Sequence, residues 1–117
     1  MDDKALIRIN SLLKHIDFVL QEMKGVDYPS FVENDLLFRA VSFSIAQIGE
    51  QMIRLQEKIG EKYPKIPWIV ARRMSNFLIH DYDNVSPEIV FSTAKNDLPS
   101  LKEDFLLIKK DYEKVIA

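Results

Sequence analysis

Apolar residues recur at intervals of three and four along most of this 117-residue chain, and this period constrains the fold more than any other feature. A spacing of this kind follows one face of an α-helix, which has about 3.6 residues per turn. The stretches that show it are 6–23, 35–59, 68–81, about ten residues from Pro87, and 101–115. No stretch alternates apolar and polar residues as a half-buried strand does. The sequence therefore predicts an all-α bundle of four to five helices, with residues 1–117 forming a single domain.

Capping residues set the expected helix boundaries in the first part of the chain. Asp2 or Asp3 can cap the start of the first helix, because a carboxylate accepts hydrogen bonds from unpaired backbone N–H groups there. Gly25 can end this helix by adopting the left-handed conformation. In the turn that follows, Ser30 is the predicted cap of a short helix.

Prolines and one glycine set expectations for the rest of the chain. Pro67 suits the first position of a helix that runs to about Asp81, because its missing N–H would be unpaired there anyway. Ser86 is the predicted cap of the next helix, which Pro99 is expected to break. Gly49 lies inside the central helix, where glycine costs about 1 kcal/mol relative to alanine. We therefore expect another helix to approach closely at Gly49.

Composition narrows the functional classes. The absence of cysteine excludes disulfides, thiolate metal sites and a cysteine nucleophile. No secretion signal and no apolar run of about 18 residues is present, so we expect a cytoplasmic protein that does not enter the membrane. The net charge of −2 argues against bulk coating of nucleic acid. Segment 54–73, however, carries six basic residues against two acidic ones, which indicates either a solvated helix end and loop or a local surface for an anionic ligand.

The two histidines have different surroundings in the sequence. His15 lies on the polar side of the first helix, where a solvent-facing position is predicted. His80 follows Arg73 by seven positions and Asn76 by four, so the three side chains are expected on one helix face. A guanidinium, a carboxamide and an imidazole can position a phosphodiester, stabilise its developing charge and move a proton. This combination suits a metal-independent ribonuclease, although a helix-end histidine that caps backbone carbonyls is the structural alternative.

No cluster of histidines or carboxylates in the sequence has the spacing of metal ligands. No glycine-rich phosphate loop is present either. We therefore expect no metal and no other cofactor.

Several short motifs occur along nearly the whole chain in a characteristic order. They are Phe38-Arg39-Ala40-Val41, Ile48-Gly49-Glu50, Ile66-Pro67-Trp68, then Asn76, His80 and Tyr82, and finally Leu98-Pro99. In this order and spacing they resemble the signature of the HepT-like proteins, a branch of the HEPN superfamily. The resemblance implies a HEPN-like bundle that forms a homodimer, in which the Arg/His helices of two copies build a composite site for cleavage of RNA.

The resemblance also implies a role as a toxin. Such proteins are paired with an MNT-type nucleotidyltransferase antitoxin, which transfers AMP to a tyrosine two residues after the histidine, and Tyr82 matches that position. The structural alternative for Tyr82 is a helix-end aromatic residue that packs its ring and hydrogen-bonds its hydroxyl.

One position departs from the family pattern. Where the family usually carries the arginine of its motif, this chain has Ser75, whose hydroxyl cannot supply a positive charge to a phosphate. Arg73, with Arg72 as a substrate-binding neighbour, is therefore the expected replacement beside the matching Asn76 and His80. The alternative is a weakened nuclease that acts as a non-enzymatic dimeric partner of a nucleotidyltransferase, a nucleotide or RNA.

Overall fold

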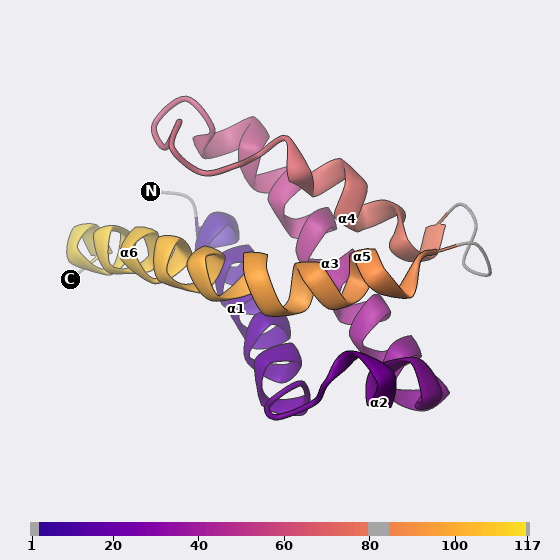
Figure 1. Ribbon diagram of the computed structural model, residues 1–117. Helices are drawn as coiled ribbons and strands as arrows, with labels where there is room; N and C mark the ends of the chain where they lie inside the picture. Colours follow the sequence, from indigo (N-terminus) through magenta and orange to yellow (C-terminus); the bar gives the residue numbers. More distant parts are fainter. Residues whose placement is uncertain (1–2, 80–84, 117) are drawn as a thin grey trace.

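The structure, a computed structural model, describes residues 3–79 and 85–116. Within these ranges the elements are α1 (Asp3–Glu22), α2 (Tyr28–Glu33), α3 (Asp35–Ile59), α4 (Val70–Ile79), α5 (Pro87–Ser92), the π-helical turn η2 (Thr93–Asp97) and α6 (Leu98–Ile116). Because α5, η2 and α6 follow one another without a break, they form one continuous rod (Figure 1). The described residues thus make five helical rods and no strand, which confirms the predicted all-α fold.

Helix α3 lies at the centre of the bundle. It packs against α1 on one side and α4 on another, and the rod of α5, η2 and α6 passes in front of α3 and α1 (Figure 1). The apolar stripes predicted from the sequence form the core between these helices, as shown by full burial of Ile9, Leu12 and Ile16 on α1 and of Ile45 and Met52 on α3. Every helix in the described ranges is too short or too polar to cross a membrane.

The first two inter-helix connections are short and capped by side chains. The side chain of Asp27 accepts a hydrogen bond from the backbone N–H of Ser30 at 2.9 Å, so α2 begins at Tyr28. The prediction that Ser30 caps this helix is therefore wrong, because the carboxylate three residues earlier takes that role. Hydrogen bonds from the side chain and from the backbone N–H of Ser30 lower the pKa of Asp27. The expected cap at Asp2 lies outside the described residues.

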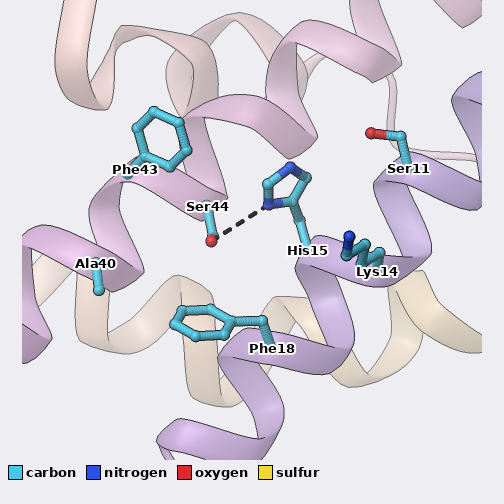
Figure 2. A pocket seen from close by; sticks show the side chains of 7 residues that line it. All are labelled: Ser11, Lys14, His15, Phe18, Ala40, Phe43 and Ser44. Atoms are coloured by element: carbon cyan, nitrogen blue, oxygen red, sulfur yellow. Dashed lines mark hydrogen bonds between the residues drawn. The ribbon is translucent and has the colours of Figure 1, made fainter.

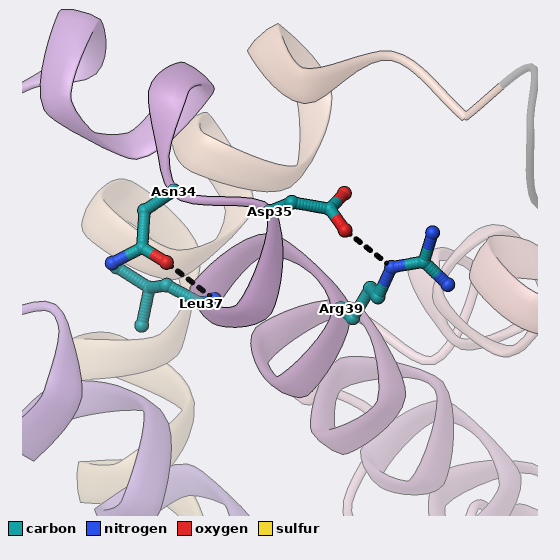
Figure 3. A network of polar contacts seen from close by, with 4 residues as sticks. All are labelled: Asn34, Asp35, Leu37 and Arg39. Atoms are coloured by element: carbon teal, nitrogen blue, oxygen red, sulfur yellow. Dashed lines mark hydrogen bonds and ion pairs between the residues drawn. The ribbon is translucent and has the colours of Figure 1, made fainter.

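Helix α3 begins with a similar cap. Asn34 accepts a hydrogen bond from the backbone N–H of Leu37 at 3.0 Å, and Arg39 forms an ion pair with Asp35 at 2.7 Å in the first turn (Figure 3). The carboxylate of Asp35 also suits the positive end of the helix dipole. These contacts fix the start of the helix where the sequence predicted it.

Helix α4 begins at Val70, three residues after the predicted start at Pro67. The intervening residues form tight turns, because the backbone N–H of Trp68 bonds to the carbonyl of Ile66 at 2.8 Å. The indole N–H of Trp68 donates to the carbonyl of Tyr63 at 3.0 Å, while its ring packs edge-on against Phe105 of α6. Burying the indole with its N–H satisfied holds this segment outside helical geometry.

Pro99 does not break the last helix, contrary to the prediction. It lies at the second position of α6, directly after the π-helical turn, in which the N–H of Leu98 bonds to the carbonyl of Thr93. The wider turn inserts one residue, so that the helix continues although the proline ring cannot join an ordinary interior turn.

Gly49 confirms the expected close approach of two helices. A Cβ atom at this position would collide with the backbone nitrogen of Ser75 and would lie 2.6 Å from the carbonyl oxygen of Ala71. Since both atoms belong to the backbone of α4, helices α3 and α4 can pack this closely only around a glycine. Gly25, by contrast, ends the first helical segment with a φ of 74°, as predicted.

Candidate functional site on helix α4

Helix α4 has one apolar and one polar face. Ala71, Met74 and Phe77 are buried against the rest of the bundle. Arg73 and Asn76 are exposed on the polar side, as is Arg72. The face that carries Arg73 and Asn76 can therefore meet a large ligand such as RNA.

Arg73 is the residue of this face for which the structure shows an ionic partner. Its Nη2 atom lies 3.5 Å from Oδ2 of Asp97, and the two side chains are 52% and 42% exposed. Asp97 is the last residue of η2, so the ion pair joins α4 to the π-helical turn. No feature of the sequence near Arg73 indicated this acidic neighbour.

Ser75 lies on a different side of the helix from Arg73. It is 3% exposed and packs at the contact with Gly49 on α3. Its hydroxyl donates to the carbonyl oxygen of Arg72 at 2.8 Å. The residue that stands at the expected arginine position is thus part of the helix packing and presents neither charge nor hydroxyl to solvent.

Two predicted site residues, His80 and Tyr82, lie outside the described residues. Their assignment continues to rest on the spacing from Arg73 and Asn76 and on the motif. Helix α4 ends at Ile79, directly before His80.

The basic segment 54–73 is spread over three elements. Arg54 and Lys58 lie on α3, Lys62 and Lys65 lie in the connection to α4, and all four are exposed. Lys62 stacks on the ring of Tyr63, with its Nζ atom 5.6 Å from the ring centroid. The segment therefore forms the end of the molecule where α3 leads into α4. This position fits the predicted alternative of a solvated helix end and loop, and it leaves the cations accessible to anions.

His15 occupies a groove that sequence reasoning missed. It is half-buried between α1 and α3, with Nδ1 3.3 Å from the hydroxyl oxygen of Ser44, and the prediction of a solvent-facing histidine is wrong (Figure 2). The groove has a volume of about 420 Å³, and Phe18 of α1 and Phe43 of α3 line it. Burial and the nearby charge of Lys14 lower the pKa of His15. The signal available in the sequence was Phe18, one helical turn along the same face.

Comparison with known proteins agrees with this arrangement. The family model described as "Ribonuclease HepT-like" matches residues 9–107. "Putative RNase MJ0125" of Methanocaldococcus jannaschii is 35% identical over 102 residues, covering 87% of this chain and 88% of the relative. "Putative RNase TTE0752" of Caldanaerobacter subterraneus is 30% identical over 95 residues, covering 81% and 85%. "Probable ribonuclease HepT" of Thermococcus cleftensis is 26% identical over 102 residues, covering 87% and 93%.

No solved structure matches the chain significantly. An all-α bundle in which one helix exposes Arg73 and Asn76 and leads to His80 is consistent with the HEPN class of helical proteins. Within that class, the chain belongs to the HepT-like ribonuclease family.

Proposed function

We propose that this protein is a HepT-like toxin, a metal-independent endoribonuclease whose site is completed by a second copy of the chain. The observation that carries the proposal is the polar face of α4. Arg73 and Asn76 are both exposed there, and in the sequence His80 follows Asn76 by four positions, the spacing of about one helical turn. The families and names of the relatives support cleavage of RNA as the reaction.

The proposed chemistry needs only groups of the protein and the substrate. The ribose 2′-hydroxyl attacks the adjacent phosphorus while the bond to the leaving 5′-oxygen breaks. His80 acts as a general base or acid in these proton transfers, and Arg73, with Arg72 beside it, stabilises the charge on the phosphorane-like transition state. Asn76 orients the substrate. Because the nucleophile belongs to RNA itself, no metal-bound water has to be generated.

The homodimer is supported by an apolar surface on the α1–α3 side. Ile7, Phe18, Leu36 and Phe43 are large apolar residues that are between 39% and 79% exposed. Phe18 and Phe43 line one groove between α1 and α3, and Ile7 lines a second groove that shares Ser11 with the first. We define these four residues as the α1–α3 apolar surface, and its occupant in the proposal is the same surface of a second copy.

The proposed partner is an MNT-type nucleotidyltransferase antitoxin. The hydroxyl of Tyr82 would attack the α-phosphorus of ATP, so that AMP is attached and pyrophosphate leaves. Tyr82 lies two residues after His80, and a nucleotide attached there adds bulk and negative charge next to the proposed cleavage site. We place this toxin–antitoxin pair in the cytoplasm, where both RNA and ATP are available.

The nuclease is tested by digestion of a generic RNA in the presence of EDTA. We expect His80→Ala to slow cleavage by about 10²–10⁴-fold and Arg73→Ala by about 10²–10³-fold. Lys109→Ala is a matched control, because Lys109 is a cation on α6, outside the α4 polar face. Cleavage that persists unchanged in both His80→Ala and Arg73→Ala would contradict the assignment.

A second candidate is a HepT-like protein without nuclease activity that binds the nucleotidyltransferase, a nucleotide or RNA. Two observations favour it: Ser75 is buried in the helix contact, and Arg73 is already paired with Asp97. Binding of RNA without any cleavage by the wild-type protein would support this alternative, whereas co-purification with a nucleotidyltransferase is expected for both candidates.

A further inference from the structure

The polar groove beside Arg73 lies between α4 and the α5–η2 segment. It has a volume of about 450 Å³. Its lining residues are Val70, Arg73, Glu88, Ile89, Ser92, Thr93 and Asp97. Among these residues one is a cation and two carry carboxylates. The groove therefore combines a group that binds phosphate with groups that repel it.

The position of Asp97 is fixed by the backbone of the π-helical turn. The hydroxyl of Thr93 donates to the carbonyl of Ile89 at 2.8 Å, and the N–H of Leu98 bonds to the carbonyl of Thr93. Ala94 and Leu98 are buried on the opposite side of this turn. A π-turn inserts one residue and rotates the residues around it, and such turns are frequent at functional sites. Here it places the carboxylate of Asp97 next to α4.

The ion pair between Arg73 and Asp97 is loose compared with others in the molecule. Its N–O distance is 3.5 Å, whereas the Arg39–Asp35 and Lys102–Asp17 pairs have distances of 2.7 Å. A guanidinium has five N–H donors, and a phosphate can accept two parallel hydrogen bonds from it. A phosphate that enters the groove can therefore make shorter and more numerous contacts with Arg73 than Asp97 does.

We propose that this groove is a phosphodiester subsite in which Arg73 is the phosphate ligand and Asp97 is the group that phosphate displaces. Asp97 then sets the affinity of the groove, because every bound phosphate must take its place and must overcome the charge of Glu88. The identity of the ligand as an RNA phosphodiester rests on the proposed function, whereas the exchange of partners at Arg73 rests on the geometry alone.

The test is a binding titration with a short, fluorescent 2′-O-methyl oligoribonucleotide, followed by fluorescence anisotropy at low salt. This probe carries RNA phosphates but has no free 2′-hydroxyl, so it binds without being cut. We expect Asp97→Asn to tighten binding by about 2–5-fold, the range that corresponds to an exposed ion pair. Arg73→Ala weakens binding, and the double variant Arg73→Ala/Asp97→Asn binds no better than Arg73→Ala.

Glu103→Gln is the matched control. It removes the same charge from an exposed position on α6 that does not line the groove. A gain in Asp97→Asn no larger than that of Glu103→Gln, or a gain that persists in the Arg73→Ala background, overturns the subsite. Unchanged thermal unfolding of the variants, recorded by circular dichroism, shows that they remain folded.

The outcomes also separate this subsite from the nuclease. Absence of cleavage of ordinary RNA together with the expected binding pattern would reject the nuclease and keep the subsite. Normal cleavage with equal binding by all variants would reject the subsite and keep the nuclease.

Discussion

The surroundings of His15 make its neutral form the favoured one in the folded protein. Burial and Lys14 lower its pKa below the ordinary value of 6.5, while the unfolded chain titrates near that value. Below about 6.5 the unfolded state therefore binds more protons at this site than the folded state does, so stability falls as the pH falls. Above this pH both states are neutral at His15 and its contribution no longer changes.

His15→Gln is expected to remove this pH dependence, because glutamine can keep a hydrogen bond to Ser44 without taking up a proton. Between pH 7.5 and 5.5 we expect the Tm of the wild type to fall by about 1–2 °C more than that of His15→Gln. Thermal unfolding followed by circular dichroism measures the difference. His80→Gln, the variant of the other histidine, should keep the fall in Tm of the wild type. An equal fall in Tm for the wild type and His15→Gln would show that the effect does not come from His15.

Ser75 allows a direct test of the missing cation. Ser75 is buried, but Arg72 and Asn76 beside it are exposed. The long aliphatic part of an arginine side chain at position 75 can therefore carry the guanidinium to the surface. We expect Ser75→Arg to raise the rate of RNA cleavage by about 10–100-fold, less than the full value of a transition-state contact because Arg73 already supplies part of it. Ser75→Ala is the control and should leave the rate unchanged. Equal rates in all three proteins, measured under single-turnover conditions, would show that position 75 has no part in cleavage.

Packing of α3 against α4 depends on the absence of a side chain at Gly49. We expect Gly49→Ala to destabilise the protein by about 1–3 kcal/mol, because the added methyl group meets backbone atoms of Ser75 and Ala71 that cannot rotate away. The better helix propensity of alanine offsets only part of this cost. Urea unfolding of Gly49→Ala and of the exposed control Asn10→Ala measures it. A Gly49→Ala midpoint equal to or above that of the wild type would mean that the two helices separate easily.

Helices whose signals are local were predictable from the sequence. The central helix extends from Asp35 to Ile59 as expected, because its apolar period and its ends are encoded within the helix itself. The errors arose where two local rules competed. Asp27 and Ser30 are both good caps, and only the path of the chain after α1 selects the first. Pro99 is an ordinary helix breaker, and only the π-helical turn before it allows α6 to form.

At the candidate site, the structure describes the positions of Arg73 and Asn76, while their roles in catalysis stay predictions. The shared exposure of Arg73 and Asn76 follows from the helical repeat, so the sequence was sufficient. The contacts of Arg73 with Asp97 and of His15 with Ser44 join residues far apart in the chain, and these pairings depend on how whole helices pack. No local pattern encodes such pairings.

At the scale of the whole molecule, the proposed dimer requires the α1–α3 apolar surface. Two helical faces, each about 10 Å wide and about 27 Å long over 18 residues, give a footprint of several hundred Å², close to the roughly 800 Å² per partner of stable interfaces. We expect Phe43→Glu to weaken dimerisation by about 30-fold or more, because it buries a charge at the centre of this surface. Sedimentation velocity over a concentration series measures the change. Leu107→Glu is the control, since Leu107 is 64% exposed on α6 and lies outside this surface. Equal dimerisation of both variants would show that the interface lies outside the α1–α3 apolar surface.

A composite site makes one prediction that a site within a single chain does not. His80→Ala and Arg73→Ala are each expected to be nearly inactive, but a mixture of the two can regain activity by exchange of subunits. If each site takes its histidine from one copy and its arginine from the other, half of the dimers formed at random are mixed, and each mixed dimer has one intact site of two. Activity should therefore return to about a quarter of the wild-type value. The measurement is RNA cleavage after the two variants have been unfolded and refolded together, compared with refolding them separately. Recovery of activity also requires the dimer itself, so adding Phe43→Glu to both variants should abolish the recovery. A mixture that stays inactive although dimers form would instead mean that each site takes His80 and Arg73 from the same chain.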